Sequence, residues 1–285
     1  VLELKETEAA GKFDYAIFHK RTNPFKKINT DSLGLKFKHR ENKFVEFNRE
    51  LLIPHMMSAE GPGVAVGDIN GDKLDDIYLG GAKWQEGYLF TQDRNGIFTR
   101  SRQPEIEVDS TSEDVGSIFV DVDGDKDLDL AVISGGNEFS GSSTQMKPRL
   151  YLNDGVGHFS KSTGLPDLFI TGSCVSSADY DRDGDMDLFI GVRAIPWKYG
   201  VRPDSYILQN DGVGNFKDVT MQVAKPLQKI GFVKSAIWAD IDSDQDEDLV
   251  IAGDWMPITI LVNENGNFKS LEKTGIENEL GWWNA

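Results

Sequence analysis

The sequence predicts an all-β protein: a β-propeller of four-stranded blades with calcium-binding loops, present as a partial, truncated propeller. Three observations support this fold class. An acidic motif, Asp-x-[Asp/Asn]-x-Asp-x-x-x-Asp, occurs four times, each time directly before a short apolar stretch. A glycine-containing turn followed by Phe recurs behind every copy. The copies lie about 50 to 60 residues apart, which is the length that a four-stranded blade requires.

Each acidic motif has the oxygen donors of a calcium loop. Carboxylate or amide oxygens stand at positions 1, 3, 5 and 9, and the backbone carbonyl of position 7 can add another. Calcium takes six to eight oxygen ligands, whereas magnesium prefers to keep its waters. No His or Cys stands in the loops, which excludes a zinc or copper site. We expect about four calcium ions, and the predicted metal residues are Asp68, Asn70, Asp72, Leu74 and Asp76; Asp121, Asp123, Asp125, Asp127 and Asp129; Asp179, Asp181, Asp183, Asp185 and Asp187; and Asp240, Asp242, Asp244, Asp246 and Asp248.

The EF-hand is the main alternative, because its loop begins in the same way. It requires a bidentate Glu at position 12 and a helix on each side. Position 12 is apolar in all four copies (Leu79, Val132, Ile190 and Ile251) and belongs to a run of strand-forming residues. We therefore expect each loop to join two strands. An acidic turn without metal is less favourable, since closely spaced carboxylates repel one another.

The remaining pattern organises the chain into repeats. Turns that precede Phe98, Phe159, Phe216 and Phe268 follow apolar runs and predict β-hairpins. Each unit is then strand, calcium loop, strand, variable loop, strand, tight turn and strand. We expect a linker or lead-in segment over 1–35 and the propeller over 36–285, with complete repeats that start near residues 61, 114, 172 and 233 and an incomplete next blade at 281–285. A parallel β-helix is the structural competitor, but its repeats are far shorter.

Composition limits the classes of partner. The formal net charge of the 285-residue chain is −17, which disfavours nucleic acid and anionic membrane surfaces. No apolar run is long enough to span a bilayer. Cys174 is the one cysteine, so no intramolecular disulfide forms, and we expect a buried, inert thiol. Calcium sites of modest affinity would be empty in the cytosol, which favours an extracytoplasmic protein: secreted, cell-surface or periplasmic.

The paired loops and hairpins resemble the FG-GAP or VCBS repeat of integrin α-subunit propellers. Gly61-Pro-Gly-Val-Ala-Val-Gly-Asp-Ile-Asn-Gly-Asp72, Gly135-Gly-Asn-Glu-Phe139 and Arg149-Leu-Tyr-Leu-Asn-Asp-Gly155 are similar to bacterial, Bacteroidetes-type relatives of the cartilage acidic protein family. The resemblance covers roughly residues 36–285. It implies a calcium-binding propeller, usually seven-bladed, in a large exported or surface protein. With four complete repeats, the chain is expected to be part of a longer polypeptide with further domains.

Function is expected in the variable loops between the second and third strand of each repeat. Aromatic and hydrogen-bonding residues recur there and suit sugar rings or protein interfaces; the ligand-binding candidates are Trp84, Asn137, Glu138, Arg193, Trp197, Tyr199, Arg202 and Trp255. The alternative role of these tryptophans is to cover hydrophobic gaps between blades. The predicted function is binding or adhesion through a glycan or protein ligand. Calcium is expected to be structural, and direct coordination of the ligand through calcium is the alternative.

Catalysis has little support in the sequence. The histidines His19, His39, His55 and His158 follow no catalytic or ligand spacing, and no motif of a known nucleophile or phosphate loop is present. We therefore expect no enzyme. The alternative is the scaffold or catalytic domain of a carbohydrate-active lyase or hydrolase, with Lys83, Arg149, Arg193 and Lys198 as the residues that could take part.

Overall fold

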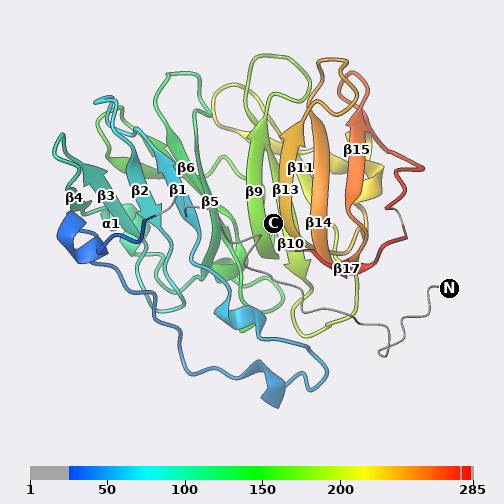
Figure 1. Cartoon of the computed structure of the whole chain (residues 1–285), viewed down its shortest axis with the longest axis horizontal. Coiled ribbons are helices and arrows are strands. Elements are labelled where there is room, and N and C mark those ends of the chain that lie inside the picture. Colours follow the sequence, from blue (N-terminus) through cyan, green and yellow to red (C-terminus); the bar gives the residue numbers. More distant parts are fainter. Residues whose placement is uncertain (1–25, 277, 284–285) are drawn as a thin grey trace, which may run out of the picture.

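The computed structural model describes residues 26–276 and 278–283. It contains four antiparallel sheets, and the strands of each pair in chain order. The sheets are β1 (Val64–Gly67), β2 (Asp76–Leu79), β3 (Tyr88–Gln92) and β4 (Phe98–Ser101); β5 (Asp114–Val120), β6 (Asp129–Ser134), β7 (Arg149–Asn153) and β8 (Phe159–Ser162); β9 (Thr171–Ala178), β10 (Asp187–Ala194), β11 (Tyr206–Asn210) and β12 (Phe216–Asp218); and β13 (Phe232–Ala239), β14 (Asp248–Met256), β15 (Thr259–Asn263) and β16 (Phe268–Ser270). The all-β expectation is confirmed, while the described residues form no closed ring (Figure 1).

All four acidic motifs connect the first two strands of a sheet, as predicted. In each sheet the residue before position 1 pairs with the Asp at position 9, and these pairs are Gly67 with Asp76, Val120 with Asp129, Ala178 with Asp187, and Ala239 with Asp248. Strands on both sides of the loops rule out the EF-hand. The four predicted Phe residues each begin the last strand of a sheet and are buried.

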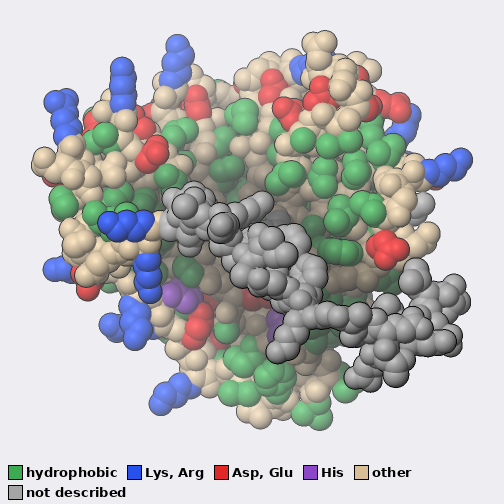
Figure 2. All heavy atoms as spheres, viewed as in Figure 1, with side chains coloured by type: hydrophobic (Ala, Val, Ile, Leu, Met, Phe, Trp, Pro, Cys, Tyr) green, Lys and Arg blue, Asp and Glu red, His purple; other side chains and the backbone are tan. Residues whose placement is uncertain are grey.

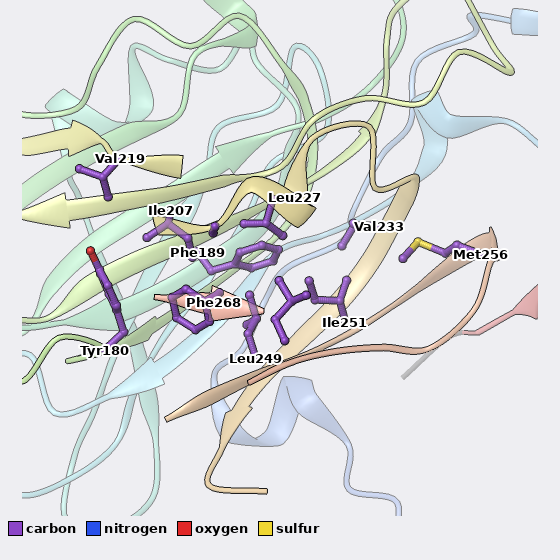
Figure 3. Packing of buried hydrophobic residues seen from close by; sticks show 12 residues of the cluster. Tyr180, Phe189, Ile207, Val219, Leu227, Val233, Leu249, Ile251, Met256 and Phe268 are labelled. Carbon is purple, nitrogen blue, oxygen red and sulfur yellow. The ribbon is translucent and has the colours of Figure 1, made fainter. Parts of the chain in front are cut away.

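Each pair of neighbouring sheets encloses its own apolar core. Tyr78 and Leu89 of the first sheet pack with Leu130 of the second, and a second cluster joins the second and third sheets. The core between the third and fourth sheets is drawn in Figure 3, where Phe189 and Leu249 approach from opposite sides. A four-stranded sheet is therefore buried by its neighbours, which is the physical reason for repetition.

The first strands of neighbouring sheets pass close to one another, and small residues permit this approach. A Cβ on Gly63 would lie 3.0 Å from the backbone of Gly116, and a Cβ on Gly116 would lie 3.2 Å from Cα of Cys174. Burial raises the pKa of the Cys174 thiol to about 11. Small residues thus fit the crowded first strands, and the raised pKa agrees with the expected unreactive thiol.

Helices are short and lie outside the sheets. They are η3 (Thr30–Leu33), η4 (Glu46–Asn48), η5 (Met57–Ala59), α1 (Pro104–Glu107), η6 (Thr144–Met146), α2 (Thr220–Val223) and η7 (Lys225–Leu227). Residues 36–60, which we call the crossing segment, contribute no strand. In Figure 1 this segment runs below the sheets, at the end opposite the acidic loops, before the chain rises into β1.

The last described residues join the fourth sheet. Gly281 and Trp282 form β17 (Gly281–Trp282), which pairs with Met256 and Asp254 of β14. Residues 284–285 lie outside the described residues, as do 1–25 with His19. The next blade at 281–285 and the linker over 1–35 therefore stay predictions.

Candidate metal centres and ligand-binding face

The backbone of each acidic loop wraps around the Asp at position 1. Its carboxylate accepts a hydrogen bond from the position-6 N–H in all four loops, and the donors are Lys73 at 2.8 Å, Lys126 at 3.0 Å, Gly184 at 3.1 Å and Gln245 at 3.1 Å. Positions 4 and 6 both have positive φ in every loop. Three of the position-6 residues are not glycine, although the left-handed region disfavours them. The four loops therefore share one backbone conformation, even where a non-glycine residue has to adopt a positive φ.

Three loops bring carboxylates from positions 1, 3 and 9 together. Ligand oxygens of the three Asp residues in each group lie within 4.8 Å of one another. The groups are Asp121, Asp123 and Asp129; Asp179, Asp181 and Asp187; and Asp240, Asp242 and Asp248. Carboxylates this close to one another repel. A divalent cation bound between them, with ligand bonds of about 2.3–2.6 Å, would offset this repulsion.

The Asp at position 9 is fully buried in every loop. In the second loop, Asp129 accepts hydrogen bonds from the N–H groups of Asn153 at 2.8 Å and Val122 at 3.0 Å. Burial raises the pKa of Asp129 to about 7. The two hydrogen bonds act in the opposite direction, and the nearby charges of Asp123 and Asp127 raise the pKa further. Burial likewise raises the pKa of Asp187 to about 7. A bound cation would instead favour the ionised form of both groups.

The donor set of the third loop fits a hard cation. Asp179 Oδ1 and Asp187 Oδ2 are buried oxygens with no hydrogen-bond partner among the described residues. Both residues belong to the group of three whose oxygens converge. Buried polar atoms are normally satisfied, so two such oxygens beside one another indicate a missing ligand. Calcium would supply the positive charge that they share.

Positions 5 and 7 lie outside the groups of three carboxylates, and their role as ligands stays a prediction. The position-5 carboxylates are exposed and accept the N–H of position 7, as Asp125 does from Asp127 at 3.1 Å. At position 7, the Asp185 side chain lies close to Gly212 of the following hairpin, and Asp246 pairs with Arg182. The structure therefore does not bring these side chains into the three-Asp groups. The carbonyl role of position 7, including that of Leu74, stays a prediction.

The first loop differs because position 3 is Asn70. Its amide nitrogen donates to Asp76 Oδ2 at 3.1 Å, while its oxygen accepts from the Asp72 N–H at 3.0 Å. Asp68 accepts the N–H groups of Gly71 and Lys73, both at 2.8 Å. This loop carries one charge less than the others, so we expect its calcium affinity to be the lowest.

Three asparagines that the sequence analysis did not single out connect neighbouring loops. Asn153 Nδ2 donates to the carbonyl of Ile69, at position 2 of the preceding loop, at 2.8 Å, and to the carbonyl of Leu128 in its own loop at 3.1 Å. Asn210 and Asn263 repeat this arrangement with the next pairs of loops. The available signal was their recurrence at the end of the third strand, shortly before the hairpin Phe.

At the opposite end of the sheets, the crossing segment contacts the variable loops. Glu50 accepts hydrogen bonds from Asn137 Nδ2 at 2.5 Å and from the Tyr199 N–H at 3.1 Å. The Arg49 guanidinium lies 4.9 Å from the Trp197 ring centre and donates to the Asn137 carbonyl. Four predicted ligand-binding residues are joined in this way, because Glu138 also accepts from Asn42 and Lys83.

Arg193 is the centre of a buried ionic network. Its side chain is 1% exposed, and Nη2 donates to Asp254 Oδ2 at 2.5 Å while Nε donates to Glu60 at 3.2 Å. Lys234 also reaches Glu60, at 2.8 Å. Burial opposes the ionisation of Glu60, but His55, Arg193 and Lys234 outweigh it and lower its pKa to about 2. Arg193 therefore joins the crossing segment to the third and fourth sheets and is not a free ligand-binding cation.

Three predicted tryptophans lie at or beyond the end of a second strand. Trp84 and Trp197 follow β2 and β10, Trp255 is the last but one residue of β14, and all three have positive φ. Their exposed fractions are 67%, 52% and 52%. Trp255 Nε1 donates to the Tyr199 hydroxyl at 3.1 Å. Exposure of this extent argues against their use as covers for the gaps between sheets. Arg202 is exposed and lines a separate pocket with Tyr206.

Functional contacts from the crossing segment had no signal in the sequence. Glu46, Glu50 and Glu60 stand outside any repeat. Glu46 accepts hydrogen bonds from Ser58 within the crossing segment, whereas Glu50 and Glu60 have partners far along the chain. One effect of this segment is an acidic environment around Glu113, whose pKa rises to about 9 because it is buried and close to Glu41, Glu138, Glu46 and Glu60.

Comparison with known proteins agrees with this geometry. Two stretches, residues 68–132 and 133–190, match the FG-GAP-like repeat family. The first match begins at position 1 of the first acidic loop, and the second ends within β10 (Asp187–Ala194). The chain thus contains FG-GAP-like repeats. The relation to the cartilage acidic protein family stays a prediction, and no curated protein matches the chain.

Among solved structures, the chain is similar to the biofilm matrix protein Bap1 of V. cholerae. Sequence identity is 16% and the TM-score is 0.36, with 75% of this chain and 30% of that chain covered. The chain thus spans less than a third of that protein's length. None of the described helices has the length and hydropathy of a membrane span.

Proposed function

We propose that the chain is a calcium-binding module of an exported or cell-surface protein and that it serves adhesion by binding a glycan or protein ligand. The observation that carries the proposal is the convergence of three Asp carboxylates in each of three loops. Four calcium ions, with the weakest in the first loop, would hold the loops that connect the first two strands of every sheet. Ligand binding would occur at the opposite end, where the tryptophans are exposed.

The first test uses one substitution in each of two loops. Asp125→Ala and Asp183→Ala remove exposed position-5 carboxylates, so we expect each variant to bind about one calcium ion fewer and to melt at a lower temperature when calcium is present. Isothermal titration and thermal melts measure both effects. In EGTA the variants should melt close to the unmodified protein, because their side chains contact mainly their own loops. Calcium titrations that do not change in either variant would refute the ligand assignment.

A binding role is favoured over catalysis because most of the cationic residues considered for catalysis are held in ion pairs. Lys83 pairs with Glu138, Arg149 with Asp114 at 2.5 Å, and Arg193 with Glu60 and Asp254. Of the four cations considered for catalysis, three are therefore engaged by carboxylates. Glycan-array binding without product formation would support the module, whereas release of unsaturated or shortened sugars would support an enzyme. If Trp197 and Trp255 variants change stability alone, the face is architectural.

A further inference from the structure

A row of cations lies beside the first sheet. Residues 36–40 alternate in character, with Lys36, Lys38 and Arg40 exposed and the side chains of Phe37 and His39 partly buried. This alternation is that of extended chain, in which successive side chains point to opposite sides. Phe37 packs edge-on against Tyr88 of β3, with ring centres 5.3 Å apart. The three cations are thus the exposed members of this stretch, while Phe37 anchors it to the first sheet.

The side chain of Gln85 fixes this row to the first variable loop. Gln85 Oε1 accepts from the Arg40 N–H at 2.8 Å, and Gln85 Nε2 donates to the Lys38 carbonyl at 3.0 Å. Two bonds to alternate residues hold the backbone extended over this stretch. The spacing of the cations is thus set by the backbone at about 7 Å per pair of residues.

The row borders a cavity of about 740 Å³. Its walls carry Lys36, Lys38, Arg40 and Lys83, with Asp31 as the one carboxylate. Within the described residues, Lys36, Lys38 and Arg40 make no ion pair, while Lys83 pairs with Glu138. In Figure 2, Lys and Arg side chains gather on the left, where residues 30–45 and the first sheet lie. Three cations without a carboxylate partner are notable in a chain of net charge −17, and they favour an anionic ligand.

An aromatic platform completes the cavity. Trp84 lines it, is 67% exposed, and has a φ of 71°. Its backbone N–H donates to the Ser110 carbonyl at 2.7 Å, which holds this unfavourable conformation in place. An exposed indole with a fixed backbone can pack against the apolar face of a sugar ring while cations bind the charged groups of the same chain.

We propose that this cavity binds an acidic polysaccharide, with carboxylate or sulfate groups at Lys36, Lys38 and Arg40 and a sugar ring on Trp84. The inference rests on the proposed ligand-binding function and gives it a ligand class. Nucleic acid is the less suitable polyanion, because its affinity depends on many phosphate contacts, and the rest of this acidic chain would repel a long duplex.

The test compares four probes on the full chain with calcium present: hyaluronan oligosaccharides, dextran sulfate, neutral dextran and single-stranded DNA. We expect one or both acidic polysaccharides to bind and neutral dextran not to bind. The triple variant Lys36→Gln/Lys38→Gln/Arg40→Gln should weaken this binding by about tenfold or more, as expected for the loss of three exposed ion pairs. Hyaluronan binding alone would assign carboxylates, and dextran sulfate binding alone would assign sulfates.

A matched triple variant controls for net charge. Lys217→Gln/Lys225→Gln/Lys229→Gln removes three exposed lysines elsewhere and should change binding by less than twofold. Trp84→Ala should weaken binding without changing its salt dependence. Equal loss in both triple variants, DNA binding as tight as that of the polysaccharides, or binding of none of the acidic probes would overturn the inference. Calcium titration of the same samples separates the two proposals. If calcium binding is intact but the cavity does not bind the acidic probes, the calcium-binding module still stands and only the assignment of the cavity fails.

Discussion

Asp129→Ala will destabilise the calcium-free protein by about 2–6 kcal/mol, because two buried N–H groups lose their acceptor and each costs about 1–3 kcal/mol. The donors are those of Val122, within the loop, and Asn153, at the end of the third strand. The same substitution removes a carboxylate from the second group of three Asp residues. We therefore expect lower stability in EGTA and a further deficit when calcium is added, measured by urea unfolding under both conditions.

Asp125→Ala is the matched control in the same loop. Its side chain is exposed and accepts only the Asp127 N–H, at 3.1 Å, among the described residues. We expect it to lower calcium-dependent stability while the calcium-free stability changes by about 1 kcal/mol or less. Equal stability of Asp129→Ala and the unmodified protein in EGTA would contradict the structural role assigned to position 9.

Arg193→Ala is expected to cost about 3–5 kcal/mol, since it removes the closest cation of the buried Asp254 carboxylate and leaves the partly buried Glu60 with Lys234 and His55. The guanidinium contacts both residues and is itself 1% exposed. Loss of this contact should also loosen the crossing segment from the third and fourth sheets. Chemical unfolding measures the first effect, and faster amide exchange or proteolysis within residues 42–60 measures the second.

Arg202→Ala serves as the matched control for the loss of an arginine. Arg202 is exposed, so we expect its removal to change stability by about 0.5 kcal/mol or less. If Arg193→Ala proves no more destabilising than Arg202→Ala, the network around Glu60 does not stabilise the fold.

Local, repeated signals allowed the strand order and the position of the acidic loops between the first two strands to be predicted. The Asp at position 9 begins the second strand in all four sheets, and the hairpin Phe begins the fourth. Both follow from patterns a few residues long, which determine turns and strand starts. Exposed Trp84 was also recognised from its loop, although its role as ligand platform stays a prediction.

Contacts between distant residues could not be predicted. Glu60 pairs with Arg193, and Glu50 with Asn137 and Tyr199, although these residues are far apart in the sequence. Because Glu50 and Glu60 belong to no repeat, no periodic pattern in the sequence predicts these contacts. The Gln85 clamp on residues 38 and 40 is of the same kind. The direction of the position-7 side chain could not be predicted from the motif either, because it depends on contacts with residues outside the loop, such as the hairpin that contains Gly212.

The most direct test of the account is the number of calcium ions that the unmodified chain binds, measured by equilibrium dialysis of metal-free protein and repeated on the Asp129→Ala variant. Four ions are expected for the unmodified chain, three in the loops whose carboxylates converge and the weakest in the first loop, and one fewer for the variant. Binding of no calcium at millimolar concentration, or an equal number of ions in both proteins, would contradict it.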